Sequence, residues 1–298
     1  MQLTREYTPR PGEGNLYKRA IWITILGNVF LASIKAYTAW ISGSVAIYAD
    51  AANSISDVLY SFLMVLGLWV AQRPPDLSHP QGHSRFEPLV GLAVALSMSF
   101  AGFEAARNAF MRLQEGAVAI EPGLPTVVLL VSAATKAGMF ILIRNLAKKL
   151  DSPTLRASSK DNLSDVLTSI AAFIGAFGSK LISPLLDPIA GFAVAAWIFR
   201  AAFGAAKENL NFLTGGGASK ELRDEIIATV VAVPGVIRVH HLMTDYAGPR
   251  LVADMHVNVA GETPLRDAHK ITDEIIQKVE AIPEVDRAYV HLEPDDWE

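Results

Sequence analysis

Long apolar segments fill about the first two thirds of the chain, and polar stretches separate them. Each segment has about the 20 mostly apolar residues that a helix needs to cross the core of a bilayer. Six such segments lie near residues 20–41, 44–71, 86–108, 123–146, 161–181 and 186–206. This pattern predicts a polytopic α-helical membrane domain with six transmembrane helices over residues 20–210, preceded by a polar segment over 1–19.

The pattern changes after residue 211, where Thr214 and the three glycines that follow it form a flexible stretch. Beyond this stretch, some segments have apolar residues at helical spacing, and others alternate apolar and polar residues as strands do. The expected elements are a helix over 221–233, strands over 236–246 and 251–259, a helix over 264–282 and a strand over 285–292. We therefore predict a second domain over 211–298, an α+β unit with the order αββαβ.

The composition is typical of a membrane protein, with 51% hydrophobic residues, 19% charged residues and a mean hydropathy of +0.30. Residues 1–210 hold 18 Lys/Arg and 14 Asp/Glu, a net charge of +4, whereas residues 211–298 hold 8 and 16, a net charge of −8. This distribution excludes nucleic acid as a partner, because phosphate binding needs clustered Lys and Arg. With no cysteine in the sequence, metal ligands must be histidines, carboxylates or amides.

Basic residues favour one end of the predicted helices. The N-terminal segment and the connections 73–85 and 144–160 carry more Lys and Arg than the opposite side, which has Arg107, Arg112 and Lys180. Basic connections remain in the cytoplasm. The first twenty residues lack the apolar core of a signal peptide. We therefore expect a multi-pass protein of the cell (inner) membrane with both termini in the cytoplasm.

Carboxylates interrupt two of the apolar segments. Asn53 and Asp57 lie four residues apart in the second segment, as do Asp161 and Asp165 in the fifth. Each pair occupies one helical face, so two neighbouring helices would bring four oxygen-bearing side chains together. A single aspartate of this kind often caps a helix or lies in water at its end. Two matched pairs favour a divalent-cation site inside the membrane.

The ligand types also suggest a mechanism. Three aspartates in a cavity of low dielectric constant repel one another, which favours protons on them when no metal is bound. A divalent ion needs deprotonated ligands and expels those protons, so a site that faces each side in turn would exchange metal for protons. An all-oxygen site suits Mn²⁺, Mg²⁺ or Ca²⁺ better than Zn²⁺, with Fe²⁺ in between.

All seven histidines lie outside the predicted membrane helices. Asp76, His79 and His83 fall in the connection between the second and third helices, with a spacing compatible with one metal ion. In the tail, His240 and His256 lie on neighbouring strands, and His291 and Glu293 share one face of the last strand. A lone histidine is more often a surface or core residue. For this cluster, a metal site and a surface role remain equal alternatives.

These motifs resemble those of the cation diffusion facilitator family of divalent-metal/proton antiporters, over residues 18–294. The most specific matches are Gly43-Ser44-Val45-Ala46 before Asn53-x-x-x-Asp57, the pair Asp161-x-x-x-Asp165, and Asp76-x-x-His79-x-x-x-His83 followed by Glu87. The resemblance implies six transmembrane helices, a cytoplasmic αββαβ domain like small metallochaperones, and a homodimer. It also implies transport rather than catalysis, with metal cations, protons and membrane lipids as partners.

The resemblance implies three groups of metal ligands. They are a transport site of Asn53, Asp57, Asp161 and Asp165, a loop site of Asp76, His79 and His83, and a cytoplasmic two-metal site of His240, His256, His269, His291 and Glu293. Zinc members of the family characteristically have histidine where Asp161 stands, and the quartet here is similar to that of bacterial manganese exporters. Cargo Mn²⁺ is therefore favoured over Fe²⁺ and Zn²⁺, with divalent metals as regulatory ligands elsewhere.

Some positions depart from the family pattern. Glu293 stands where the family usually has aspartate, and Thr214 stands where an acidic partner of Arg85 is familiar at the dimer contact. His241 has no assigned counterpart, and Asp50 lies one turn before the quartet.

Two other function classes compete with transport. One is a membrane-anchored metal sensor or storage protein, against which the aspartate pairs inside the membrane argue. The other is an intramembrane metallohydrolase, for which the sequence supplies no motif with a separate base. We therefore expect a transporter and not an enzyme.

Overall fold

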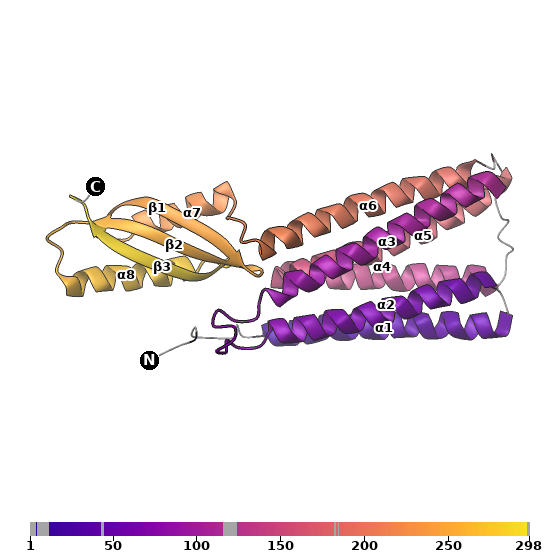
Figure 1. The fold of residues 1–298 in the computed structure, drawn as a ribbon, viewed down its shortest axis with the longest axis horizontal. Coiled ribbons are helices and arrows are strands. Elements are labelled where there is room, and N and C mark those ends of the chain that lie inside the picture. The colour runs from indigo at the N-terminus through magenta and orange to yellow at the C-terminus, as the bar shows by residue number, and fades with distance from the viewer. Residues whose placement is uncertain are drawn as a thin grey trace. The chain divides into compact units, whose positions relative to one another are not determined.

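The computed structural model describes residues 4, 12–42, 45–115, 124–181, 183 and 185–296. The chain divides into two compact units, Met1–Leu210 and Asn211–Glu298. The first unit consists of helices alone, and the second consists of helices packed on a sheet (Figure 1).

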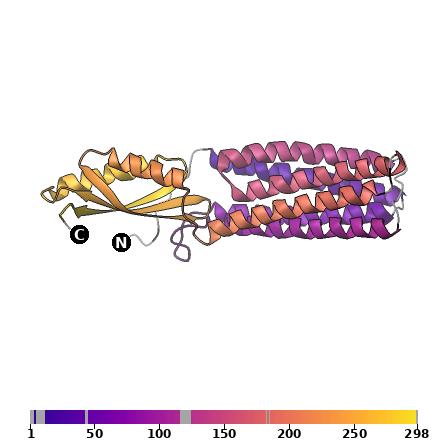
Figure 2. The ribbon, with the colours of Figure 1, turned by 90° about the horizontal axis from the view of Figure 1, so that it is seen from above.

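The first unit consists of long helices that run side by side (Figures 1 and 2). They are α1 (Glu13–Ser42), α2 (Val45–Ala71), α3 (Phe86–Glu115), α4 (Leu124–Leu150), α5 (Pro153–Leu181) and α6 (Leu186–Leu213). α5 packs against α3 and α4, and α1 packs against α2 and α4. α6 approaches α3 closely at Gly91, where an added Cβ would clash with the Asn209 side-chain amide. A larger residue at this position would therefore require the Asn209 side chain to move.

Five of these helices are long and apolar enough to cross a membrane: they contain Glu13–Ile41, Ser54–Ala71, Phe86–Gln114, Val127–Leu150 and Pro188–Leu213. α5 does not reach that criterion over its described residues, because its first half carries charges such as Arg156, Lys160 and Asp161. The predicted fold class, a polytopic helical membrane domain followed by an α+β domain, is confirmed.

The start of α5 is fixed by a buried polar network. Pro153 occupies the first helical position, and the Ser152 hydroxyl oxygen accepts the Leu155 backbone N–H at 3.1 Å, as expected of an N-cap. Ser152 also donates to Glu87 Oε1, and Tyr17 donates to Glu87 Oε2 at 3.0 Å. This network ties the beginnings of α3 and α5 to α1.

The second unit follows the predicted αββαβ order. Its elements are α7 (Lys220–Val231), β1 (Val236–Ala247), β2 (Arg250–Val259), α8 (Leu265–Glu280) and β3 (Val285–Pro294). The strand order is β1-β2-β3, with β1 antiparallel to β2 and β2 parallel to β3. α8 supplies the crossover that a parallel pair requires.

The two faces of this sheet have different environments. Burial alternates along β2, so that Leu251, Ala253, Met255 and Val257 are buried and His256 lies on the other face. The buried side packs against α7 and α8 through residues such as Ile226 and Ile275. The histidines are therefore presented on the side of the sheet opposite its core.

Candidate metal sites

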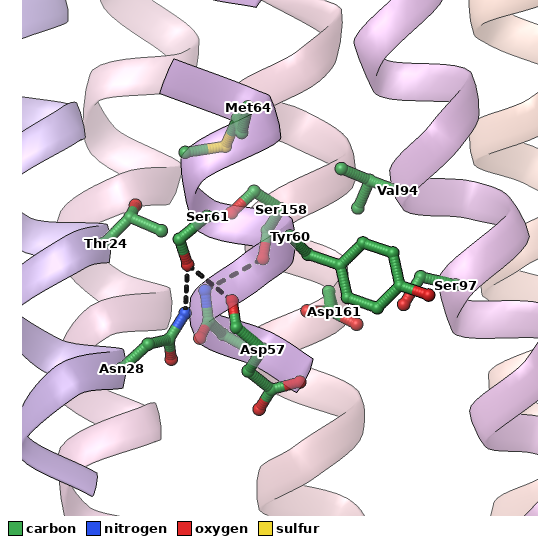
Figure 3. Close-up of a pocket in the computed structure, with 11 residues that line it drawn as sticks. Thr24, Asn28, Asp57, Tyr60, Ser61, Met64, Val94, Ser97, Ser158 and Asp161 are labelled. Carbon is green, nitrogen blue, oxygen red and sulfur yellow. Dashed lines mark hydrogen bonds between the residues drawn. The ribbon is translucent and has the colours of Figure 1, made fainter. Parts of the chain in front are cut away.

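The predicted transport-site aspartates come from two helices of the first unit. Asp57 lies on α2, and Asp161 and Asp165 lie one turn apart on α5. Asp57 and Asp161 line the same small cavity, of about 30 Å³ (Figure 3). Asn53 lies on α2, but its side chain is outside the described residues, as is that of Asp50. The structure therefore places Asp57 and Asp161 at one cavity. Asp165 does not line it, and among the described residues the three carboxylates do not form a group with ligand atoms within 4.8 Å of one another.

The cavity lining is polar although the cavity lies within the helical unit. Its polar side chains come from α1, α2, α3 and α5, and they are Thr24, Asn28, Asp57, Tyr60, Ser61, Ser97, Ser158, Asp161 and Asn162. Asn28 donates to the Ser61 hydroxyl at 2.7 Å, and Ser61 donates to the Asp57 backbone oxygen at 2.7 Å. A polar space of this volume is large enough for a water molecule or a bare metal ion.

Lys136 on α4 joins this group of carboxylates. Its Nζ lies 3.1 Å from Asp57 Oδ2 and 2.7 Å from Asp165 Oδ2, and its side chain is buried. A buried ammonium is stable only with such partners, because taking a charge out of water is costly. With all four groups charged, three aspartates and one lysine have a net charge of −2, equal and opposite to that of a divalent ion.

Lys136 is not among the site residues predicted from the sequence. That prediction rests on oxygen-bearing side chains in the apolar segments, and an ammonium group does not bind a metal ion. Yet an ionisable residue within a predicted membrane helix is itself a signal of function. The same signal marks Lys35 on α1, which is also buried.

The loop between α2 and α3 brings Asp76, His79 and His83 together, with one ligand atom of each within 4.8 Å of the others. His83 Nε2 lies 3.4 Å from Asp76 Oδ2, and His83 is buried. The Asp76 carboxylate accepts the backbone N–H groups of His79 at 2.7 Å and Ser78 at 2.9 Å. These bonds, that of His79 foremost, lower the pKa of Asp76, so the carboxylate is kept in the form that binds metal.

The tail groups His240, His256 and Glu293 in the same way, with ligand atoms within 4.8 Å of one another. Glu293 Oε1 lies 2.9 Å from His256 Nδ1, and its Oε2 lies 3.2 Å from His240 Nε2. A register shift in β1 falls between Val239 and His241. Such a bulge turns two successive residues towards one partner. Accordingly, the His240 and His241 rings lie 5.5 and 5.1 Å from the His256 ring.

The other two predicted tail ligands, His291 and His269, are outside this group. His291 pairs with His256 across β2 and β3, and its Nε2 is 3.5 Å from Glu293 Oε1. His269 lies on α8 with an exposed side chain, and its Nε2 lies 3.7 Å from Asp273 Oδ2. It is not part of the group formed by His240, His256 and Glu293. A ligand role for His269 stays a prediction.

Both units match known protein families. Residues 21–214 match the model of the cation efflux transmembrane domain, and residues 218–295 match that of the cation efflux protein, cytoplasmic domain. The chain belongs to the cation diffusion facilitator family. This assignment confirms the resemblance seen in the sequence motifs, and it establishes a multi-pass membrane protein that is a divalent metal cation efflux transporter.

Full-length relatives of this cation diffusion facilitator support the assignment. An uncharacterised transporter of Methanocaldococcus jannaschii is 32% identical over 93% of this chain and 98% of its own length. The manganese efflux system protein MneS of Bacillus subtilis is 28% identical over 91% of this chain and 93% of its own length. Among solved structures, a nickel form of the MamM C-terminal domain is 26% identical, covers 26% of this chain and all of its own, and has a TM-score of 0.26.

Proposed function

We propose that this transporter exports Mn²⁺ in exchange for protons by alternating access. The observation that carries the proposal is the convergence of carboxylates from α2 and α5 around a small polar cavity. Carboxylate, amide and hydroxyl oxygens are hard ligands, which Mn²⁺ accepts more readily than Zn²⁺ does. The similarity to a manganese efflux protein supports the same cargo. Zn²⁺ or Fe²⁺ export is the alternative within the family.

Proton exchange follows from the charges of the site. Without metal, ionised Asp57, Asp161 and Asp165 repel one another, and protons relieve that repulsion. A divalent ion binds the deprotonated carboxylates and releases the protons. The Lys136 ammonium holds two of the same carboxylates, so it competes with the incoming ion for their oxygens. In our proposal this competition keeps the binding weak enough for release on the far side.

Flux into sealed proteoliposomes tests cargo and coupling together. Mn²⁺ and Zn²⁺ uptake would be measured under an imposed pH gradient for the wild type, for Asp57→Ala and for Asn53→His/Asp161→His. We expect proton-coupled Mn²⁺ flux that Asp57→Ala abolishes and that the double histidine variant shifts towards Zn²⁺. Mn²⁺ flux that ignores the pH gradient would refute proton exchange.

The loop and tail groups serve as regulatory metal sites in this proposal. Each combines two imidazoles with one carboxylate, a ligand set that also accepts Zn²⁺ and Fe²⁺. Metal bound at the tail would draw two acidic tails into a homodimer and activate export. The tail group also favours a second candidate, a membrane-anchored metal sensor or storage protein. Tight binding at the tail with no flux of any metal would support that candidate.

The orientation belongs to the same proposal. We infer that the protein lies in the cell membrane with both termini in the cytoplasm, because basic residues such as Arg144, Lys148 and Lys149 lie where α4 ends. The tail would then sample cytoplasmic metal before transport begins.

A further inference from the structure

A wide groove opens between α4, α5 and α6, and the residues of α5 that line it differ from those that line the transport-site cavity. Its volume is about 730 Å³, and its walls combine apolar side chains such as Trp197 with basic ones. The basic side chains are Arg144, Lys148, Arg156, Lys160 and Arg200. Apolar side chains are expected along a groove in a membrane unit. Five cations along the same groove are not expected and require an explanation.

Two of these cations, Arg156 and Lys160, are neutralised within the chain by two carboxylates. Asp151 accepts from Arg156 Nη1 at 2.6 Å, and Glu208 is the second carboxylate. Glu208 on α6 accepts from Arg156 Nε and lies 3.4 Å from Lys160 Nζ. Within the described ranges, Arg144, Lys148 and Arg200 have no carboxylate oxygen within 4.0 Å. Among the described residues, the groove therefore carries positive charge on both α4 and α6 that no carboxylate compensates.

Arg200 lies deeper in the unit than the other cations. It precedes Glu208 by eight residues on α6, which is about 12 Å of helix. Glu208 itself pairs with Arg156, close to the start of α5. An exposed arginine within a membrane helix is costly unless an anion or water meets it. The groove thus leads from the helix ends inward to a cation for which the described residues supply no carboxylate.

The groove also has space beside Arg200. An added Cβ at Gly204, one turn along α6, would meet nothing within 4 Å. The Trp197 and Phe203 side chains are 43% and 73% exposed, so apolar surface accompanies the cations. A ligand that fits must combine an anionic group with hydrocarbon.

We propose that this groove binds an anionic phospholipid, with its phosphate between Arg144 and Arg200 and its acyl chains along Trp197 and Phe203. Basic pockets between membrane helices recognise lipid headgroups of this kind. The charge complementarity favours a lipid over a second copy of the chain, which would bring its own cations to the same surface. Free phosphate would leave the apolar wall uncovered. The proposal does not depend on which metal is carried.

Native mass spectrometry of the purified full-length chain tests the proposal. The protein in detergent would be mixed with dioleoylphosphatidylglycerol or dioleoylphosphatidylcholine, and the retained lipid would be counted. We expect the wild type to retain the anionic lipid preferentially. Arg144→Gln/Arg200→Gln should weaken this retention by about fivefold for each cation removed. Lys149→Gln, which removes an exposed cation of α4 outside the groove, should leave it unchanged.

A steric variant tests the site without changing charge. Gly204→Leu fills the groove and should reduce retention of the anionic lipid. Gly138→Leu is the matched control, because Gly138 on α4 also has nothing within 4 Å of an added Cβ and does not line the groove. Equal retention of both lipids by the wild type, or unchanged retention by Gly204→Leu, would overturn the proposal.

Two further outcomes identify another occupant. If millimolar inorganic phosphate displaces the lipid completely, the groove is a phosphate site and the proposal fails. If Gly204→Leu changes the ratio of monomer to dimer and not the lipid count, the groove is an interface between copies, and the proposal fails as well.

Discussion

At the scale of single residues, Lys136 and the transported ion depend on the same oxygens. The ammonium lies 3.1 Å from Asp57 Oδ2 and 2.7 Å from Asp165 Oδ2. Replacing Lys136 with Met removes this competitor, so we expect the KM for Mn²⁺ uptake to fall by about tenfold. The maximal rate should fall too, because tighter binding slows release. Uptake at graded Mn²⁺ concentrations in proteoliposomes measures both quantities.

Lys136→Arg is the matched variant for this prediction. It keeps a positive charge and should remain closer to the wild type in KM than Lys136→Met. A higher KM in Lys136→Met would show that Lys136 assists metal binding and would refute competition.

A second prediction at the scale of single residues concerns the ionisation of Asp76 at the loop site. Its pKa is lowered chiefly by the His79 backbone N–H. A carboxylate with a lowered pKa is fully ionised above the ordinary pKa range of aspartate. It loses its charge only as the pH falls through the lowered pKa. Acidification from about pH 7 to about pH 5 should therefore leave Asp76 ionised.

Metal binding by Asp76→Asn checks this assignment. In a background of Asp57→Ala and His256→Ala, which removes ligands of the other sites, Asp76→Asn should lower loop affinity by about tenfold at neutral pH. The slope of affinity against pH should stay the same as in the background. A changed slope would mean that Asp76 itself titrates in this range.

The sequence predicted these site residues unevenly, for a physical reason. Spacing of four residues identifies Asp161 and Asp165 as one helical face, and three nearby positions identify the loop group. The position of Lys136 between the aspartates depends on how α4 packs against α5, which no local spacing encodes. The separation of His269 from the tail group likewise depends on where α8 packs.

At the scale of elements, the transport site depends on how α5 begins. Glu87, on α3, is 3% exposed and accepts hydrogen bonds from Tyr17 and Ser152. Glu87→Ala removes the acceptor of both hydrogen bonds, which should cost about 1–3 kcal/mol for each bond lost. We expect a lower melting temperature in detergent and a lower Mn²⁺ flux, because α5 carries Asp161 and Asp165.

Glu104→Ala provides the control on the same helix. Glu104 pairs with Arg107 at 3.1 Å, but both side chains are exposed and outside the buried network, so its removal should have less effect on stability than that of Glu87. Equal melting temperatures for Glu87→Ala and Glu104→Ala would argue against the network as the anchor of α5.

Sequence periodicity predicted the type and the order of the helices and strands. It predicted less well where each of them begins and ends. The apolar pattern predicts a fifth helix from residue 161, whereas α5 begins at Pro153. Residues 153–160 are too polar to look like a membrane segment, although Ser152 and Pro153 are a typical helix start. The polar beginning is stable as helix because it contacts Glu87 and Glu208 within the unit.

At the scale of the whole molecule, the two units differ in the sign of their net charge. The tail holds 8 Lys/Arg and 16 Asp/Glu over residues 211–298, so two tails repel each other. Metal at the tail sites should reduce this repulsion and promote dimerisation. Energy transfer between labelled tails should rise with added Mn²⁺ or Zn²⁺, and high salt should reduce the metal needed, because it screens the acidic charges.

His256→Ala/His291→Ala tests the metal part of this prediction. The variant should lose the metal response of the tails and keep the salt response, which depends on surface charge alone. Unchanged energy transfer and unchanged metal dependence of flux in this variant would remove the support for activation through the tail.

The polarity of α5 also bears on how the protein is made. On scales of membrane insertion, each Asp, Lys or Arg at a helix centre costs about 2.5–3.5 kcal/mol, so α5 is a poor candidate to enter the bilayer alone. α4 precedes it through a turn at Asp151 and Ser152, and Lys136 of α4 lies 2.7 Å from Asp165. Because the pair neutralises both charges, we expect α4 and α5 to enter the bilayer together as one hairpin, after the ribosome has finished α5. The ion pair that we propose for transport would then also assist membrane insertion.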